Sequence, residues 1–181
     1  MIGFQKSTFI SLDFPSEMAE KIRKIRLSLE PTIAWKPVVI SLAGSSGCGH
    51  ISDEQDIFEA NKIMTKLSKT LSPISVTFST INSFPNTDIY FFEFDDESAI
   101  NNLYEKIKNC GIIFSESEFP FKAHCTIHFK GKITSKKKQQ ILNTIIPIEK
   151  FELNTISFIS DYKHLSRFSM MKMNNKQLTG A

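Results

Sequence analysis

The chain has 181 residues and a formal net charge of +3, and its 41% hydrophobic and 23% charged residues exclude an intrinsically disordered protein. Its three cysteines are an odd number without paired spacing, which excludes a disulfide framework. No apolar run approaches the ~20 residues that cross a bilayer, and Asp13 and Pro15 cut short the apolar stretch near the N-terminus. We therefore expect a single soluble, cytoplasmic domain over residues 1–181 with no membrane partner; the sequence leaves its oligomeric state open.

The hydrophobic pattern predicts strands and helices in alternation. In chain order we expect a strand at 7–13, a helix with its apolar face over 18–29, a buried strand at 35–43, a helix with an apolar stripe over 57–71, a hairpin of strands at 74–78 and 89–94, a helix at 99–107, a strand at 122–130, a helix at 135–144, and strands near 151–160 and 168–173. Ser52 and Gln55 match a capping box, which predicts Ser52 as the N-cap of the second helix. His164 falls in an expected turn and receives no role.

This order of elements indicates the fold class. Strand–helix–strand occurs early in the chain and again late, with similar lengths, and no linker rich in Pro, Gly or Ser separates the two parts. We therefore expect an α+β fold of two related lobes with antiparallel sheets around a central groove, packed together as one body.

The small net charge hides an asymmetry along the chain. Residues 1–119 hold 11 Lys and Arg against 16 Asp and Glu, a net charge of −5, whereas residues 120–181 hold 11 against 3, a net charge of +8. A basic C-terminal third favours an anionic ligand or surface. The alternative is a solvated lysine-rich face, for which the run at 136–138 is typical.

The predicted strand with the most reactive side chains is 123–128, AHCTIH. Because side chains alternate across a strand, His124, Thr126 and His128 are expected on one face. Imidazole titrates near neutral pH and exchanges protons there, and a hydroxyl two residues away can reach the same phosphate group. A strand histidine satisfied by a neighbouring group is the alternative interpretation.

Several short segments occur along the chain in an order that is typical of a known protein family. They are residues 9–15 (FISLDFP), 35–37 (WKP), the 84–85 turn (FP), and the 119–120 approach (FP) to the triplet 124–126 (HCT). In this order the chain resembles the two-histidine (2H) phosphoesterase superfamily, the 2′-5′ RNA ligase-like and cyclic phosphodiesterase proteins, over most of its length. The resemblance implies two lobes that each offer a His-x-Thr/Ser motif to a shared groove.

The chemistry implied by this resemblance is metal-free attack on a phosphodiester, without a cofactor. One histidine acts as general base, the other as general acid, and the two hydroxyl residues hold the phosphate. His124 and Thr126 match the second motif in full. The first motif reads Val39-Ile40-Ser41, in which Ser41 fits the hydroxyl position but Val39 has no proton to exchange. Loss of an acid–base partner typically lowers the rate by about 10²–10⁴.

Two histidines elsewhere are candidates to replace the missing one. His50 begins another His-x-Ser triplet at the end of the glycine-rich loop 44–49, which we expect to be flexible enough to swing it into the groove. His128 is the second candidate, although a surface position is the alternative for it. We also expect His128, Lys122 and Lys130 to contact the substrate.

Two rival sites share residues with this region. The loop 44–49 follows a buried strand and precedes a helix, as a nucleoside triphosphate-binding P-loop does, but His50 and Ile51 stand where Lys and Ser or Thr are needed. Its glycines still allow backbone amides to meet an anion. A zinc site from Cys48, His50, His124 and His128 has suitable side chains but unsuitable spacing.

The sequence thus favours a phosphodiester-directed enzyme that hydrolyses a cyclic phosphate or a 2′-5′-linked nucleotide or RNA end without a metal. His124 is the expected acid–base residue, with Thr126 and Ser41 on the phosphate. His50 is a candidate to replace the missing histidine, although the strand pattern ends near Ala43 and Ser52 is the expected cap of the next helix. The alternative is a nucleotide- or RNA-binding module that lost catalysis with the replacement at Val39. A degenerate P-loop nucleotide binder is a minor alternative.

Overall fold

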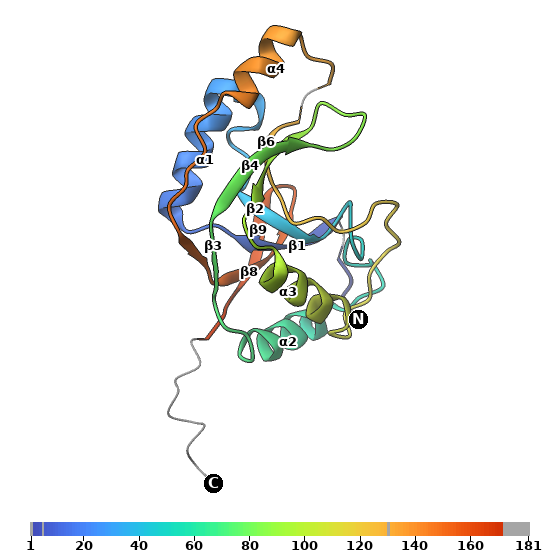
Figure 1. Cartoon of the computed structure of the whole chain (residues 1–181). Helices are drawn as coiled ribbons and strands as arrows, with labels where there is room; N and C mark the ends of the chain where they lie inside the picture. Colours follow the sequence, from blue (N-terminus) through green and yellow to red (C-terminus); the bar gives the residue numbers. More distant parts are fainter. Residues whose placement is uncertain (1, 5, 130, 172–181) are drawn as a thin grey trace, which may run out of the picture.

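The computed structural model describes residues 2–4, 6–129 and 131–171, and it confirms a mixed α+β fold (Figure 1). In chain order the elements are β1 (Thr8–Asp13), α1 (Ser16–Leu29), the 3-10 helix η1 (Pro31–Ile33), β2 (Val39–Ala43), α2 (Ile57–Ser68), β3 (Ile74–Val76), β4 (Phe78–Ser83), β5 (Tyr90–Phe94), α3 (Ser98–Lys108), β6 (Cys125–His128), α4 (Ser135–Leu142), β7 (Phe151–Leu153), β8 (Thr155–Ser160) and β9 (Lys163–Ser169). None of the described helices is long and apolar enough to cross a bilayer.

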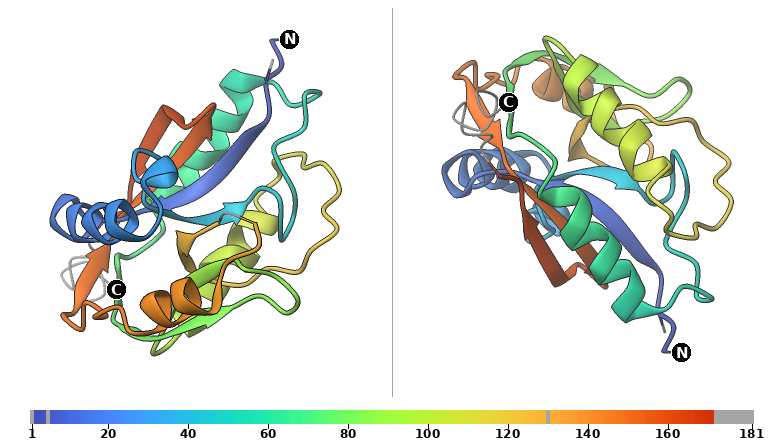
Figure 2. Two further views of the ribbon diagram at one scale, coloured as in Figure 1. Left: turned by 90° about the horizontal axis from the view of Figure 1, so that it is seen from above. Right: turned by 90° about the horizontal axis from the view of Figure 1, so that it is seen from below.

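The described strands form antiparallel sheets that join distant parts of the chain. One sheet has the order β2-β1-β8-β9, another has the order β4-β5-β6, and a third pairs β3 with β7. The pairing of β1 with β8 runs from Thr8 opposite Ser160 to Asp13 opposite Thr155. Figure 2 shows the C-terminal strands, in orange to red, beside the blue β1. The division into sheets therefore does not follow the two halves of the sequence, because the first and third sheets each combine early and late strands.

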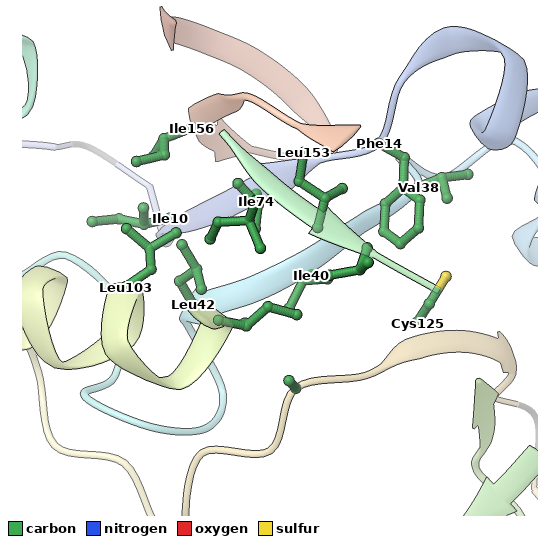
Figure 3. Close-up of a cluster of buried hydrophobic side chains, with 14 of the residues drawn as sticks. Ile10, Phe14, Val38, Ile40, Leu42, Ile74, Leu103, Cys125, Leu153 and Ile156 are labelled. Atoms are coloured by element: carbon green, nitrogen blue, oxygen red, sulfur yellow. The ribbon is translucent and has the colours of Figure 1, made fainter. Parts of the chain in front are cut away.

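The helices connect the sheets into one body with a continuous core. α1 packs on β6, α2 on β9 and α3 on β2, so that each of these helices covers a strand remote from it in sequence. Ile40 and Leu42 of β2 lie in one buried cluster with Leu103 of α3 and with Ile74 and Leu153 of the small sheet (Figure 3). Burial of these apolar side chains is the main force that holds the sheets against each other.

Several predicted element bounds are wrong in an informative way. The strand expected at 35–43 begins only at Val39, because η1 and an irregular segment precede it, and Trp35 is 63% exposed. The run expected at 74–78 divides: Ile74–Val76 pairs with β7, and the partner of β5 in the hairpin is β4. A local alternation of apolar residues does not reveal which sheet a strand joins.

The C-terminal strands and the second helix also differ from expectation. The strand expected at 151–160 divides into β7 and β8, which belong to different sheets, and the last strand is β9 rather than 168–173, of which 172–173 lie outside the described residues. His164 therefore lies on a strand, where its Nε2 is 3.1 Å from Asp13 Oδ2. The N-cap of α2 is Asp56, which accepts hydrogen bonds from two backbone amides of the first turn, and Ser52 instead accepts one from the Glu54 amide.

A buried arginine ties the sheets together. Arg26 is 4% exposed on α1, and its Nε donates to the Thr126 carbonyl at 2.9 Å. Its Nη1 donates to the carbonyls of Lys36 at 3.1 Å and Pro37 at 3.2 Å. The guanidinium thus fixes β6 to the segment that leads into β2. Arg26 lies four residues after Ile22 on the apolar face of the helix, where a charged residue is rarely buried without partners.

Replacing this guanidinium is expected to destabilise the fold. Arg26→Met keeps an apolar side chain but leaves three buried carbonyl oxygens without their donor, and hydrogen bonds to charged groups each contribute about 1.5–3 kcal/mol. We expect the free energy of unfolding in urea to fall by at least about 3 kcal/mol. Arg23→Met is the control, because the ion pair of Arg23 with Glu20 is exposed and a change below about 0.5 kcal/mol is expected. Equal losses of unfolding free energy in the two variants would show that the hydrogen bonds of Arg26 do not hold β6 to the segment before β2.

Candidate functional site

A central cavity of about 270 Å³ lies where the four-stranded and three-stranded sheets meet. Phe9 of β1, Ser41 of β2 and Thr126 of β6 all contribute to its wall. Five residues singled out in the sequence line it together: Val39, Ser41, His50, His124 and Thr126. Residues of both motifs, the complete one at 124–126 and the first one with Val39 in place of histidine, therefore line the same cavity.

His124 is held in a defined orientation immediately before β6. Its Nδ1 lies 2.7 Å from the Lys122 carbonyl oxygen, so the neutral imidazole carries its proton on Nδ1 and leaves a lone pair on Nε2. The rings of Phe84 and Phe91 pack edge-on to the imidazole at 5.0 and 5.2 Å. Burial lowers the pKa of His124, which favours the neutral form that can accept a proton. This orientation leaves Nε2 of His124 able to accept a proton.

The two hydroxyl residues come from opposite walls of the cavity. Ser41 is paired with Ser11 in the large sheet, and Thr126 is paired with Phe91 in the three-stranded sheet. Val39 and Ser41 are two residues apart on β2 and therefore point to the same face, towards the cavity. The valine occupies the wall where the resemblance places a histidine, and its side chain offers neither a proton nor a hydrogen bond.

His50 reaches the cavity from a loop that is held in place. The Ser115 amide donates to the His50 carbonyl at 2.9 Å, and the Gly47 amide donates to the Phe119 carbonyl at 2.9 Å. Its imidazole lies above Gly44, since a Cβ built on that glycine would be 4.0 Å from Nε2. Burial lowers the pKa of His50. The expected loop swing is not required, because His50 already lines the cavity with His124.

Two cations in the cavity wall were missed by sequence reasoning. Arg26 and Lys36 line the cavity, and both come from the acidic part of the chain rather than from its basic C-terminal third. The available signal for Arg26 was a charged residue on an otherwise apolar helical stripe. For Lys36 it was only its position just before the first motif. Together they provide a positive environment for an anion.

The structure places two other predicted contacts, His128 and Lys122, away from the cavity wall. His128 is 2% exposed, which makes a surface position wrong; its Nδ1 lies 2.9 Å from the Asp88 carbonyl oxygen and its Nε2 lies 3.7 Å from Glu30 Oε2. Lys122 pairs with two carboxylates, Glu93 at 3.2 Å and Glu97, and its side chain does not line the cavity. Lys130 lies outside the described residues.

An irregular strand pairing explains the position of His128. On β5, Tyr90 pairs with His128 and the next residue, Phe91, pairs with Thr126, so one extra residue of β6 is accommodated between them. Such a bulge breaks the alternation of side chains across the strand. His128 therefore turns from the face that Thr126 presents to the cavity and is buried beside Glu30.

Neither rival site is supported by the fold. A P-loop leads from a strand directly into a helix, but here β2 is antiparallel to β1, and α2 begins only at Ile57, after an isolated bridge between Thr8 and Ile51. The P-loop interpretation is therefore wrong. In the described part of the chain, no group of three or more His, Cys, Asp and Glu side chains is placed to hold a metal ion.

Solved structures share this fold, although no family model and no curated relative matches the chain. TT0787 of Thermus thermophilus is similar with a TM-score of 0.63 and 14% identity, over 93% of this chain and 100% of that one. A structure described as a phosphoesterase gives a TM-score of 0.57 and 16% identity over 92% and 99%. E. coli LigT complexed with 3′-AMP gives 0.56 and 17%, also over 92% and 99%. These similarities establish the fold.

The position of His50 is expected to depend on Gly49. Gly49 has a φ of +87°, and a Cβ there would lie 1.9 Å from the Ser115 carbonyl oxygen, so Gly49→Ala must displace the loop. Gly111→Ala is the matched control, with a φ of +97° and nothing within 4 Å of the added Cβ. The control carries only the backbone cost of about 1–2 kcal/mol. We expect Gly49→Ala to lower the free energy of unfolding in urea by more than this, and equal losses would contradict the close approach.

Proposed function

We propose that this protein is a metal-independent phosphoesterase that hydrolyses a cyclic phosphate or a 2′-5′-linked nucleotide or RNA end. The observation that carries the proposal is the gathering of His124, Thr126, Ser41 and His50 around one cavity with the cation Arg26. The structures of E. coli LigT complexed with 3′-AMP, phosphate and ATP support a nucleotide as the ligand class.

In the proposed reaction a water molecule attacks the phosphorus atom. Nε2 of the neutral His124 accepts the proton of the water, and the new P–O bond forms as the bond to the ribose oxygen breaks. A protonated His50 gives its proton to that departing oxygen, which leaves as a hydroxyl. The negative charge of the bound phosphate stabilises the imidazolium that this step needs, because an opposite charge favours the protonated form.

The remaining groups of the wall hold the phosphate. The hydroxyls of Thr126 and Ser41 donate hydrogen bonds to its non-bridging oxygens, and Arg26 supplies a positive charge whose hydrogen bonds to the protein go to neutral carbonyls. Charge held beforehand in a partly buried site stabilises the transition state without reorganisation of the protein. Lys36 adds a second positive charge at the wall.

A binding module without catalysis is the second candidate, and Val39 favours it. This side chain lies in the cavity wall at the position of the missing histidine, where it closes one route for proton transfer. In this case the same hydroxyls and cations hold a nucleotide or RNA end, and His50 serves as a hydrogen-bonding group. The two candidate functions share the same ligand class, but only the phosphoesterase turns the ligand over.

Hydrolysis of nucleoside 2′,3′-cyclic phosphates and 2′-5′ oligonucleotides, assayed with EDTA present, separates the candidates. We expect His124→Ala and His50→Ala each to lower kcat by about 10²–10⁴, the usual contribution of a positioned acid or base. His164→Gln, a histidine outside the cavity, is the control with kcat unchanged. Unchanged turnover in His124→Ala refutes the mechanism, and nucleotide binding without turnover by the native protein supports the binding module.

Whether His50 replaces a histidine at position 39 can be tested by introducing a histidine at that position. Val39 lines the cavity, so Val39→His in the His50→Ala background is expected to recover at least about tenfold of the lost kcat, since a positioned acid–base group contributes about 10²–10⁴. The readout is kcat in the cyclic phosphate assay. Full activity in His50→Ala alone would remove His50 from the reaction.

The pH dependence follows from the two buried imidazoles. Burial lowers the pKa of both His124 and His50 from 6.5, and the reaction requires one of them protonated and the other neutral. The value of kcat/KM therefore peaks between two pKa values that both lie below 6.5, and it falls as the pH rises above them. Bound phosphate raises these pKa values, so kcat is expected to peak at a higher pH than kcat/KM. A kcat/KM that still rises above about pH 7.5 would contradict this assignment.

A further inference from the structure

Exposed aromatic side chains border the central cavity. Trp35 is 63% exposed, Phe129 56% and Tyr162 45%. Phe129 and Tyr162 line the cavity, and the Trp35 ring stands edge-on to the Tyr162 ring with centroids 5.0 Å apart. We call these three residues and Lys36 the aromatic rim. These three aromatic side chains are about half exposed beside the cavity, which is uncommon for side chains that only fill a core.

Lys36 places a positive charge within the aromatic rim. Its Nζ lies 4.5 Å from the Tyr162 ring centroid and 5.7 Å from that of Phe129. The same Nζ donates a hydrogen bond to the Tyr162 hydroxyl at 3.1 Å. Lys36 also lines the cavity, where Arg26 is a further cation. Aromatic faces next to cations are the combination by which proteins hold unpaired nucleotides.

The backbone at Tyr162 is strained. Asp161 and Tyr162 form the two-residue turn between β8 and β9, with φ values of 48° and 62°. Turns of this type favour Asn-Gly, because both positions need a positive φ that a bulky side chain rarely adopts. A tyrosine is retained here at a position where its ring forms part of the cavity wall. Strain of this kind gathers at ligand-binding sites.

The cavity is too small to enclose a whole nucleotide. Its volume of about 270 Å³ lies just below the range of small-molecule sites, which span roughly 300–1,000 Å³. A phosphate among Ser41, His124 and Thr126, with its ribose, leaves little of this volume. The base then lies at the mouth, where the aromatic rim is exposed.

The geometry points to the aromatic rim as a nucleobase subsite, which stacks the base of an unpaired nucleotide whose phosphate occupies the central cavity. This inference rests on the proposed function, because the phosphate position is shared. Stacking tolerates every base, since each has a π-face. The rim therefore selects nucleotides over phosphate compounds that lack a base, and does not select one base over another.

Trp35 is the chain's one tryptophan, so its fluorescence reports directly on the rim. Titration with 3′-AMP is expected to quench this emission with saturation. Inorganic phosphate is expected to leave the emission unchanged and to compete with 3′-AMP for the cavity. Quenching of equal size by inorganic phosphate would overturn the subsite, because the signal would then not report a base.

Calorimetric titration of variants measures the contribution of stacking. Trp35→Ala is expected to weaken 3′-AMP binding about tenfold, the order found for base–aromatic contacts, and to leave inorganic phosphate binding unchanged. Phe58→Ala is the matched control, because Phe58 is an aromatic side chain on α2 that is 70% exposed and outside the cavity wall. Equal 3′-AMP affinity in Trp35→Ala and the native protein overturns the subsite and leaves the phosphate site intact. Absence of binding of both ligands to the native protein overturns the proposed function together with the subsite.

Tyr162→Gly separates a binding role from a structural one. Glycine suits the positive φ of the turn, so the midpoint of urea unfolding is expected to stay the same or rise. Binding of 3′-AMP is expected to weaken by several-fold because the ring is lost, as for other base–aromatic contacts. A lower unfolding midpoint with unchanged 3′-AMP affinity would show that Tyr162 serves the fold alone, and would overturn its place in the subsite.

Discussion

The cavity depends on one buried guanidinium. Arg26 binds the carbonyl of Thr126 on one side and the carbonyls of Lys36 and Pro37 on the other, so the two motif segments are held at a fixed separation. These three partners are neutral carbonyl oxygens, which stabilise the cation without cancelling its charge. A charge removed from water and held by neutral groups favours an anion beside it. The same contact therefore shapes the cavity and places a positive charge in its wall.

The origin of the cavity's charge differs from the charge pattern of the sequence. Arg26 and Lys36 belong to residues 1–119, which have a net charge of −5, whereas the lysines at 136–138 of the basic part lie on α4 at the surface. Two cations in the wall act at short range and little screened, while the exposed lysines act through solvent within about one Debye length. The basic C-terminal third supplies His124 and Thr126 to the cavity wall, whereas both cations of the wall, Arg26 and Lys36, come from the acidic part.

What the sequence predicts well is local, and what it misses depends on pairing. The periodicity of Met18, Ile22 and Leu29 locates the buried face of α1, and the triplet at His124 locates half of the cavity. The direction of His128 depends on a bulge against β5, which no pattern within β6 contains. The division of the C-terminal strands between sheets is equally a property of their partners. Arg26 was visible as an exception on an apolar face, but its three carbonyl partners lie up to 100 residues away.

The glycine-rich loop gives a physical reason why a histidine at position 50 shares a cavity with residues of β2. β2 ends at Ala43, and Gly44 has no Cβ, so the imidazole of His50 lies above the end of the strand. A side chain at position 44 would approach the Cβ of Phe9 to 3.2 Å as well as the imidazole. A histidine at Val39 would enter from the opposite end of the strand, whereas His50 enters beyond Ala43. In the proposed reaction the proton donor therefore approaches the phosphate from a different direction, and in-line displacement requires the leaving oxygen to lie on that side. A change of histidine of this kind alters which phosphodiester fits the cavity productively, even where the phosphate itself is held by the same hydroxyls.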